Sequence, residues 1–270
     1  MVTQEQRKRQ LAREKFLRQQ QRRTAARRKA RVRNSVIASV LGVILVGSLA
    51  LYTSGVMKDD DKASASAETT PSATPSKAPD PCEKAAPGKV ETQTWKKEPA
   101  MSIDKSAKYT MSLATTCGEI DIALKTAAPH TVNSFDFLAS KGFFDHTKCH
   151  RLTTNGIYVL QCGDPTGSGS GGPGYTIPDE NLKDKSLKSN VYPAGTVAMA
   201  NTGQAHTGGS QFFLVYQDSQ LPPSYTPFGT ISESGMKVLK KIAAAGESTG
   251  AGDGAPNATV VINKATVSKS

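Results

Sequence analysis

The side chains best suited to chemistry gather between residues 146 and 172. His146, Cys149 and His150 have a spacing that could suit a metal ion. Zinc sites take three or four nitrogen, sulfur or oxygen ligands. If Cys149 forms a disulfide, only the two histidines remain, so we expect no metal site here.

A glycine-rich run follows at residues 167–172 and reads Gly-Ser-Gly-Ser-Gly-Gly. Its letters match a dinucleotide-binding fingerprint, which needs a strand before it and a helix behind it. Here Pro165 stands shortly before the run and Pro173 directly after it, so that context is missing. We therefore expect no nucleotide cofactor.

A more specific signal comes from five motifs that follow one another along the chain. They are His150-Arg151, Val159-Leu160-Gln161-Cys162-Gly163-Asp164, Met199-Ala200-Asn201, Gly209-Ser210-Gln211-Phe212-Phe213 and Phe228-Gly229. Together they resemble the cyclophilin family of peptidyl-prolyl cis/trans isomerases over about residues 109–268, in a membrane-anchored bacterial form. The resemblance implies a mainly β fold, namely a closed eight-stranded antiparallel β-barrel capped by two α-helices. It implies an active groove on the outer surface of the barrel and no metal or organic cofactor.

The resemblance also implies a role for each matching residue. Arg151 would supply the catalytic guanidinium, and Gln161 would orient it. The residues expected to bind substrate are Tyr158, Val159, Gly169, Ala200, Asn201, Gln211, Phe213, Leu221 and Tyr225. Rotation about an X-Pro amide is slow because the nitrogen lone pair is delocalised, and a charged donor aimed at the prolyl nitrogen would weaken that delocalisation.

The resemblance therefore implies an isomerase that acts on proline-containing polypeptides, and the N-terminal segments discussed below would place these partners in the extracytoplasmic space. The alternative is a catalytically weak module that binds proline-containing segments without useful turnover. Nine residues separate Arg151 from Gln161 where many family members have seven, so the turn at 153–156 is longer. Gln220 stands where many members have a tryptophan that contacts cyclosporin, so we expect weak cyclosporin binding.

The elements that must carry these side chains can be read from the pattern of apolar residues. Alternation of apolar and polar residues is typical of half-buried strands. It indicates strands at 109–114 and 118–124, followed by short apolar segments at 157–160, 196–200 and 211–216 and a last strand at 260–262. Apolar residues at helical spacing predict helices at 129–139 and 236–245.

The net charge of +11 is confined to the first 33 residues. That segment holds thirteen Lys and Arg against two Glu, so the rest of the chain is neutral. Binding to a phosphate backbone needs clustered basic residues, which the neutral remainder lacks. We therefore expect no nucleic-acid partner and interpret residues 1–33 as a basic cytoplasmic tail.

Residues 34–57 contain no charged side chain and are long enough to cross a bilayer as one helix. The basic tail before them and the acidic residues after them place the N-terminus in the cytoplasm. A cleaved signal peptide is the alternative, but its basic region would be unusually long. We expect a single-pass plasma-membrane protein with a flexible Ala/Ser/Thr/Pro-rich tether at 58–104 and an extracytoplasmic domain at 105–270.

All four cysteines follow the apolar segment, where an oxidising compartment would permit two disulfides. Sequence alone allows three pairings. Cys149 and Cys162 flank an expected hairpin, which favours them as one pair and Cys82 with Cys117 as the other.

Overall fold

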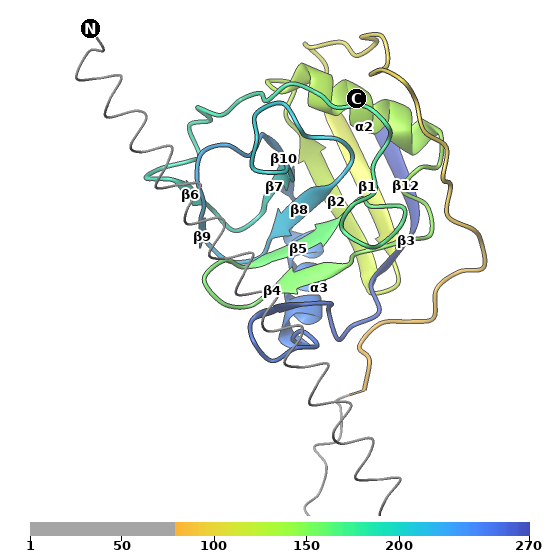
Figure 1. Cartoon of the computed structure of the whole chain (residues 1–270), viewed down its shortest axis with the longest axis vertical. Helices are drawn as coiled ribbons and strands as arrows, with labels where there is room; N and C mark the ends of the chain where they lie inside the picture. The colour runs from red at the N-terminus through yellow and green to blue at the C-terminus, as the bar shows by residue number, and fades with distance from the viewer. Residues whose placement is uncertain (1–78) are drawn as a thin grey trace, which may run out of the picture. The chain divides into compact units, whose positions relative to one another are not determined.

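The protein is described by a computed structural model over residues 79–270, which fold around a mainly antiparallel β-sheet (Figure 1). The ten strands of the sheet lie in the order β11-β4-β5-β8-β7-β10-β2-β1-β12-β3, and a separate pair joins β6 to β9. Their bounds are β1 Tyr109–Thr115, β2 Gly118–Leu124, β3 Thr147–Lys148, β4 Arg151–Thr153, β5 Val159–Cys162, β6 Val191–Tyr192, β7 Thr196–Met199, β8 Phe212–Val215, β9 Ser219–Gln220, β10 Pro227–Ile231, β11 Asp253–Gly254 and β12 Val261–Lys269.

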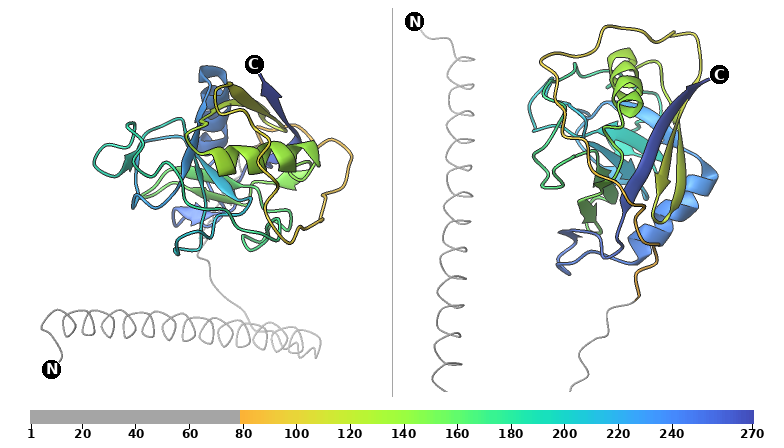
Figure 2. Two further views of the ribbon diagram at one scale, coloured as in Figure 1. Left: turned by 90° about the horizontal axis from the view of Figure 1, so that it is seen from above. Right: turned by 90° about the vertical axis from the view of Figure 1, so that its right-hand side faces the viewer.

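The strand ladder differs from the expected closed barrel of eight strands. The two-residue strands β11 and β3 stand at its ends and are not paired with each other, so the described ladder has ten strands and is open. Residues 147–153 contribute one strand near each end of this open ladder. Strand β3 is the last strand at one end and pairs with β12, whereas β4, three residues further on, lies near the other end and pairs with β5. Strand β12 is also longer than expected (Figure 2), because it pairs with the whole length of β1, from Thr115 opposite Ile262 to Tyr109 opposite Lys269.

Two helices cover the sheet, as the apolar spacing predicted. Helix α2 spans Pro129–Ser140 and packs against β12, whereas α3 spans Glu233–Ala244 and packs against β2. In the view of Figure 1 they lie toward opposite ends of the sheet. Helix α3 begins three residues before the predicted start because Ser232 caps it, with its Oγ accepting a hydrogen bond from the Gly235 N–H at 3.1 Å.

A cluster of phenylalanines fills the space between α2 and the sheet. Phe135 is fully buried. The centroid of its ring lies 4.5 Å from the ring centroid of Phe228, 5.2 Å from that of Phe144 and 5.5 Å from that of Phe212. Because Phe212 belongs to β8 and Phe228 to β10, this cluster joins α2 to the two strands that carry the motifs at 209–213 and 228–229.

Replacing Phe135 with alanine should lower the free energy of unfolding by about 3–5 kcal/mol, because the ring leaves a cavity among well-packed neighbours. Urea denaturation followed by circular dichroism measures this loss. Phe137→Ala is the matched control on the same helix, since Phe137 is only partly buried. An equal loss from both variants would contradict the central place of Phe135 in the core.

Residues 79–104 form an ordered N-terminal arm, although the sequence predicted a flexible tether there. A disulfide joins Cys82 to Cys117, and the Trp95 N–H donates to the carbonyl of Pro173 at 2.8 Å. The side chain of Asn133 donates to the carbonyl of Ala100 at 3.1 Å. The polar composition of this stretch, rich in Lys, Glu, Pro and Ala, hid these few anchors, which hold the arm along the outside of the domain (Figure 1, orange to yellow).

The expected basic tail at 1–33, the apolar segment at 34–57 and the tether up to residue 78 lie outside the described residues. Within residues 79–270, no helix combines the length and the apolar character needed to cross a membrane.

Candidate active site

Arg151 and Gln161 lie opposite each other on neighbouring strands. They are paired in register between β4 and β5, so their side chains leave the sheet on the same face. The Arg151 Nη1–H group donates to Gln161 Oε1 at 3.1 Å. The sheet therefore brings the two predicted catalytic residues together, ten positions apart in the chain.

A small pocket of about 150 Å³ opens beside this pair. Its lining combines the guanidinium and two amides with apolar side chains from β5, β8 and the loops after β7 and β9. It consists of Arg151, Ile157, Val159, Gln161, Ala200, Asn201, Phe213, Leu221 and Tyr225. Eight of the eleven residues predicted for the site meet here.

Tyr158 was predicted in this pocket, but Ile157 occupies the lining in its place. Successive residues of an extended chain point to opposite faces, so Ile157, Val159 and Gln161 share the pocket face and Tyr158 points away. The Tyr158 ring packs edge-on against Tyr216, with ring centroids 5.8 Å apart. Counting the alternation of side chains back from Gln161 would have placed Ile157 in the pocket lining.

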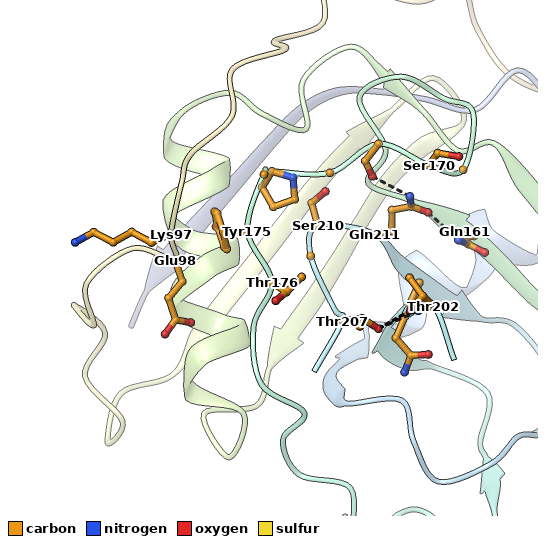
Figure 3. A pocket seen from close by; sticks show the side chains of 18 of the residues that line it. Lys97, Glu98, Gln161, Ser170, Tyr175, Thr176, Thr202, Thr207, Ser210 and Gln211 are labelled. Atoms are coloured by element: carbon orange, nitrogen blue, oxygen red, sulfur yellow. Dashed lines mark hydrogen bonds between the residues drawn. The ribbon is translucent and has the colours of Figure 1, made fainter. Parts of the chain in front are cut away.

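Gly169 and Gln211, the other two predicted residues, line a larger neighbouring cavity of about 1090 Å³ (Figure 3). The linings of the two cavities share Gln161, Ala200 and Asn201, so the cavities adjoin each other, and together we call them the groove. Gln211 connects them, because its Oε1 accepts from Gln161 Nε2 and its Nε2 donates to the carbonyl of Gly171, both at 2.9 Å. The residues Lys96, Lys97 and Glu98 of the arm form part of the far wall of the larger cavity.

The glycine-rich loop at 167–172 is held by the fully buried carboxylate of Asp164. Asp164 Oδ1 accepts hydrogen bonds from the Thr166 N–H at 2.7 Å and from Thr166 Oγ1 at 2.8 Å. Burial alone would raise the pKa of Asp164, but these hydrogen bonds outweigh it and lower the pKa below its ordinary value. Gly169 has a φ of +85°, a conformation that favours glycine. Asp164 therefore holds the loop in place, and residues 169–172 of the loop line the larger cavity.

The guanidinium of Arg151 also has an acidic partner that the sequence did not indicate. Its Nε–H and Nη2–H groups donate to the two carboxylate oxygens of Asp253, each at 2.7 Å. These hydrogen bonds raise the pKa of Arg151 above its ordinary value, and the same contact lowers the pKa of Asp253. Of the five N–H groups of a guanidinium, three are used in the described part of the chain, which leaves two for a bound ligand.

A disulfide joins Cys149, which lies two residues before β4, to Cys162 at the end of β5, close to Arg151 and Gln161. With Cys82–Cys117 it confirms the favoured pairing. Because Cys149 is oxidised, its sulfur is not available as a thiolate ligand for a metal held by His146 and His150. Burial lowers the pKa of His150, which keeps its imidazole neutral beside Arg151.

Comparison with known proteins places this groove in a family. The sequence model described as "Cyclophilin type peptidyl-prolyl cis-trans isomerase/CLD" matches residues 110–267. A "Probable peptidyl-prolyl cis-trans isomerase B" of Mycobacterium leprae is 52% identical over 165 residues, which are 58% of this chain and 56% of that protein. The "Peptidyl-prolyl cis-trans isomerase B" of Bacillus subtilis is 40% identical over 117 residues, which are 43% of this chain and 76% of that protein.

The fold agrees with this assignment. A crystal structure of a Cryptosporidium parvum cyclophilin type peptidyl-prolyl cis-trans isomerase aligns with a TM-score of 0.50 and 25% identity, covering 60% of this chain and 98% of that one. The chain spans about half the length of the mycobacterial relatives it matches. The match at 110–267 contains the whole pocket as well as Arg151 and Gln161. The chain therefore belongs to the cyclophilin-type peptidyl-prolyl cis-trans isomerase family.

Proposed function

We propose that this protein catalyses cis/trans isomerisation of X-Pro bonds in polypeptides. One observation carries the proposal: a guanidinium, fixed by Gln161 and Asp253, lies beside apolar side chains in the lining of a small pocket. Phe213, Val159 and Leu221 would hold the prolyl ring, and the free N–H groups of Arg151 would reach its nitrogen.

The chemistry needs no nucleophile, because no bond to carbon is made or broken. The barrier arises from amide resonance, and a protonated donor at the prolyl nitrogen favours the twisted state in which that resonance is lost. An enzyme accelerates the rotation when it binds the twisted state more tightly than either planar isomer. A pocket that excludes water strengthens the contact of Arg151 with the nitrogen.

The decisive experiment measures cis/trans exchange in a short X-Pro peptide by NMR, with and without the full-length protein. Uncatalysed exchange takes tens to hundreds of seconds, so acceleration is easily seen. Faster exchange supports the isomerase. Peptide binding without faster exchange would replace it with the alternative, a module that grips proline-containing segments.

We also propose that the apolar segment at 34–57 anchors the protein in the plasma membrane, with the domain outside the cytoplasm. Its uncharged sequence and the basic tail before it support this orientation, as do two disulfides in one domain, which are typical of oxidising compartments. Protease added to intact cells should then cleave the domain, and membranes should retain it in alkaline carbonate. Release by carbonate, or protection from protease, would contradict the proposal.

Weak binding of cyclosporin remains our expectation for the groove. Gln220 lies exposed on β9, next to the pocket residue Leu221, where the drug would find an amide instead of an indole. Inhibition of exchange should therefore need far more than nanomolar drug, and Gln220→Trp should bind it more tightly than the parent. Potent inhibition of the parent would show that this position does not control the affinity.

A further inference from the structure

Asp253 reaches the catalytic arginine from a part of the chain 102 residues away. It lies on β11, whose two residues pair with β4, with Asp253 opposite Thr153 and Gly254 opposite Leu152. The carboxylate takes the Nε and Nη2 edge of the guanidinium, each contact at 2.7 Å. Two parallel charge-assisted hydrogen bonds fix a guanidinium in plane and in direction.

The loop that carries Asp253 is held together by internal hydrogen bonds to a buried carboxylate. Glu247 is buried, and its carboxylate accepts from Thr249 Oγ1 at 2.7 Å and from the Gly252 N–H at 2.9 Å. Hydrogen bonds from Thr249 lower the pKa of Glu247, so it stays a carboxylate inside the loop. The Thr249 hydroxyl oxygen also lies 3.2 Å from the carbonyl oxygen of Asp253, so Thr249 contacts both residues. The position of Asp253 is therefore set by the loop and not by its contact with Arg151 alone.

The longer turn after Arg151 supports this loop. The Thr154 N–H donates to the carbonyl of Gly252 at 2.9 Å. Gly252 has a φ of +90°, and a Cβ there would lie 2.5 Å from the Cβ of Asn155, so only glycine allows this approach. The turn after Arg151, which is two residues longer than in many family members, therefore packs against the segment that carries Asp253 and supports it.

The ion pair itself contributes little to folding. The side chain of Arg151 is 39% exposed and that of Asp253 is 53% exposed, and exposed pairs of this kind are screened by water. The contact with Asp253 instead restricts the Arg151 side chain, which is long and otherwise free to adopt many rotamers. Gln161 alone touches only Nη1, which leaves the plane of the guanidinium free to turn.

We propose that Asp253 is a positioning residue for X-Pro isomerisation, which holds the Arg151 guanidinium with its free N–H groups directed at the prolyl nitrogen. This inference rests on the proposed isomerase function. A guanidinium that is already oriented does not lose rotamer freedom when the twisted amide forms, so the gain appears in the rate of rotation more than in peptide binding.

The test compares Asp253→Ala with the full-length parent in the same peptide exchange assay. We expect kcat to fall about tenfold while KM stays within about twofold, and the melting temperature to fall by no more than about 3 °C. Asp253→Asn keeps one acceptor for the guanidinium and should lie between the two. Asp104→Ala is the matched control, because it removes another exposed ion pair, with Lys269, at a separate place in the domain, and should leave exchange unchanged.

A spectroscopic readout follows the contact itself. Arg151 is the only arginine after Arg33, so its Nε–H signal can be assigned by its loss in Arg151→Ala. Bonded to Asp253, this proton should exchange slowly with water, and it should exchange faster in Asp253→Ala. Unchanged kcat, a higher kcat or an unchanged Nε–H signal in Asp253→Ala would overturn the inference.

The isomerase function of Arg151 and the positioning role of Asp253 can be disproved separately. If Arg151→Ala exchanges the peptide as fast as the parent, the proposed catalytic centre fails. If Arg151→Ala is inactive while Asp253→Ala equals the parent, only the positioning role fails. Adding Asp253→Ala to Arg151→Ala should cause no further loss, and an additional loss would show that Asp253 does not act through Arg151.

Discussion

Arg151→Ala should lower kcat/KM for X-Pro exchange by about a hundredfold or more, while the protein stays folded. Removing one preorganised donor from a site that stabilises developing charge costs this much in other enzymes. The fold should survive, because the Arg151–Asp253 pair is exposed and contributes little to stability. NMR exchange of a short X-Pro peptide measures the rate, and thermal unfolding verifies the fold.

Arg151→Lys is the matched control for charge. Lysine keeps the positive charge but lacks the planar fork that meets Asp253 and Gln161 together. We expect its rate to lie between those of Arg151→Ala and the parent. If lysine restores the full rate, charge alone suffices and the oriented guanidinium is not needed. If alanine retains the parent rate, the pocket is a binding module or acts through another residue.

The sequence predicted the parts of the site that lie in local motifs. Arg151, Gln161 and Phe213 stand in short patterns with recognisable neighbours, and the sheet brings them together because β4, β5 and β8 are adjacent. The prediction of Tyr158 in the pocket was wrong, because it followed the family position instead of the strand alternation that turns Ile157 inward.

Asp253 and the N-terminal arm could not be predicted in the same way. Asp253 stands in a glycine-rich segment with no motif, and its contact with Arg151 spans 102 residues, a pairing that no local pattern encodes. The arm has the composition of a linker, and its order depends on a few contacts such as Cys82–Cys117 and the Trp95 ring, 5.1 Å from that of Phe137. The composition of a segment describes its average residue, whereas the path of this arm depends on a few individual contacts.

The second large effect is expected from the disulfide close to Arg151 and Gln161. Replacing Cys149 and Cys162 together with serine should lower the free energy of unfolding by about 3 kcal/mol, because a 13-residue separation is no longer closed in the unfolded chain. Strand β4 has only three residues, and Cys149 lies two residues before it, so the crosslink also holds the start of β4 close to β5. We expect kcat/KM for the short peptide to fall several-fold as well.

Cys82→Ser with Cys117→Ser is the matched control. This crosslink spans 35 residues, so its loss should cost as much stability or more, about 4 kcal/mol. It joins the arm to the domain and touches neither Arg151 nor Gln161, so exchange of a short peptide should stay at the parent rate. Denaturant unfolding and peptide exchange on both double variants separate the two effects. If both variants lose activity in proportion to stability, the Cys149–Cys162 disulfide has no specific role at the site; if only the first does, it aligns the two strands that carry the catalytic residues.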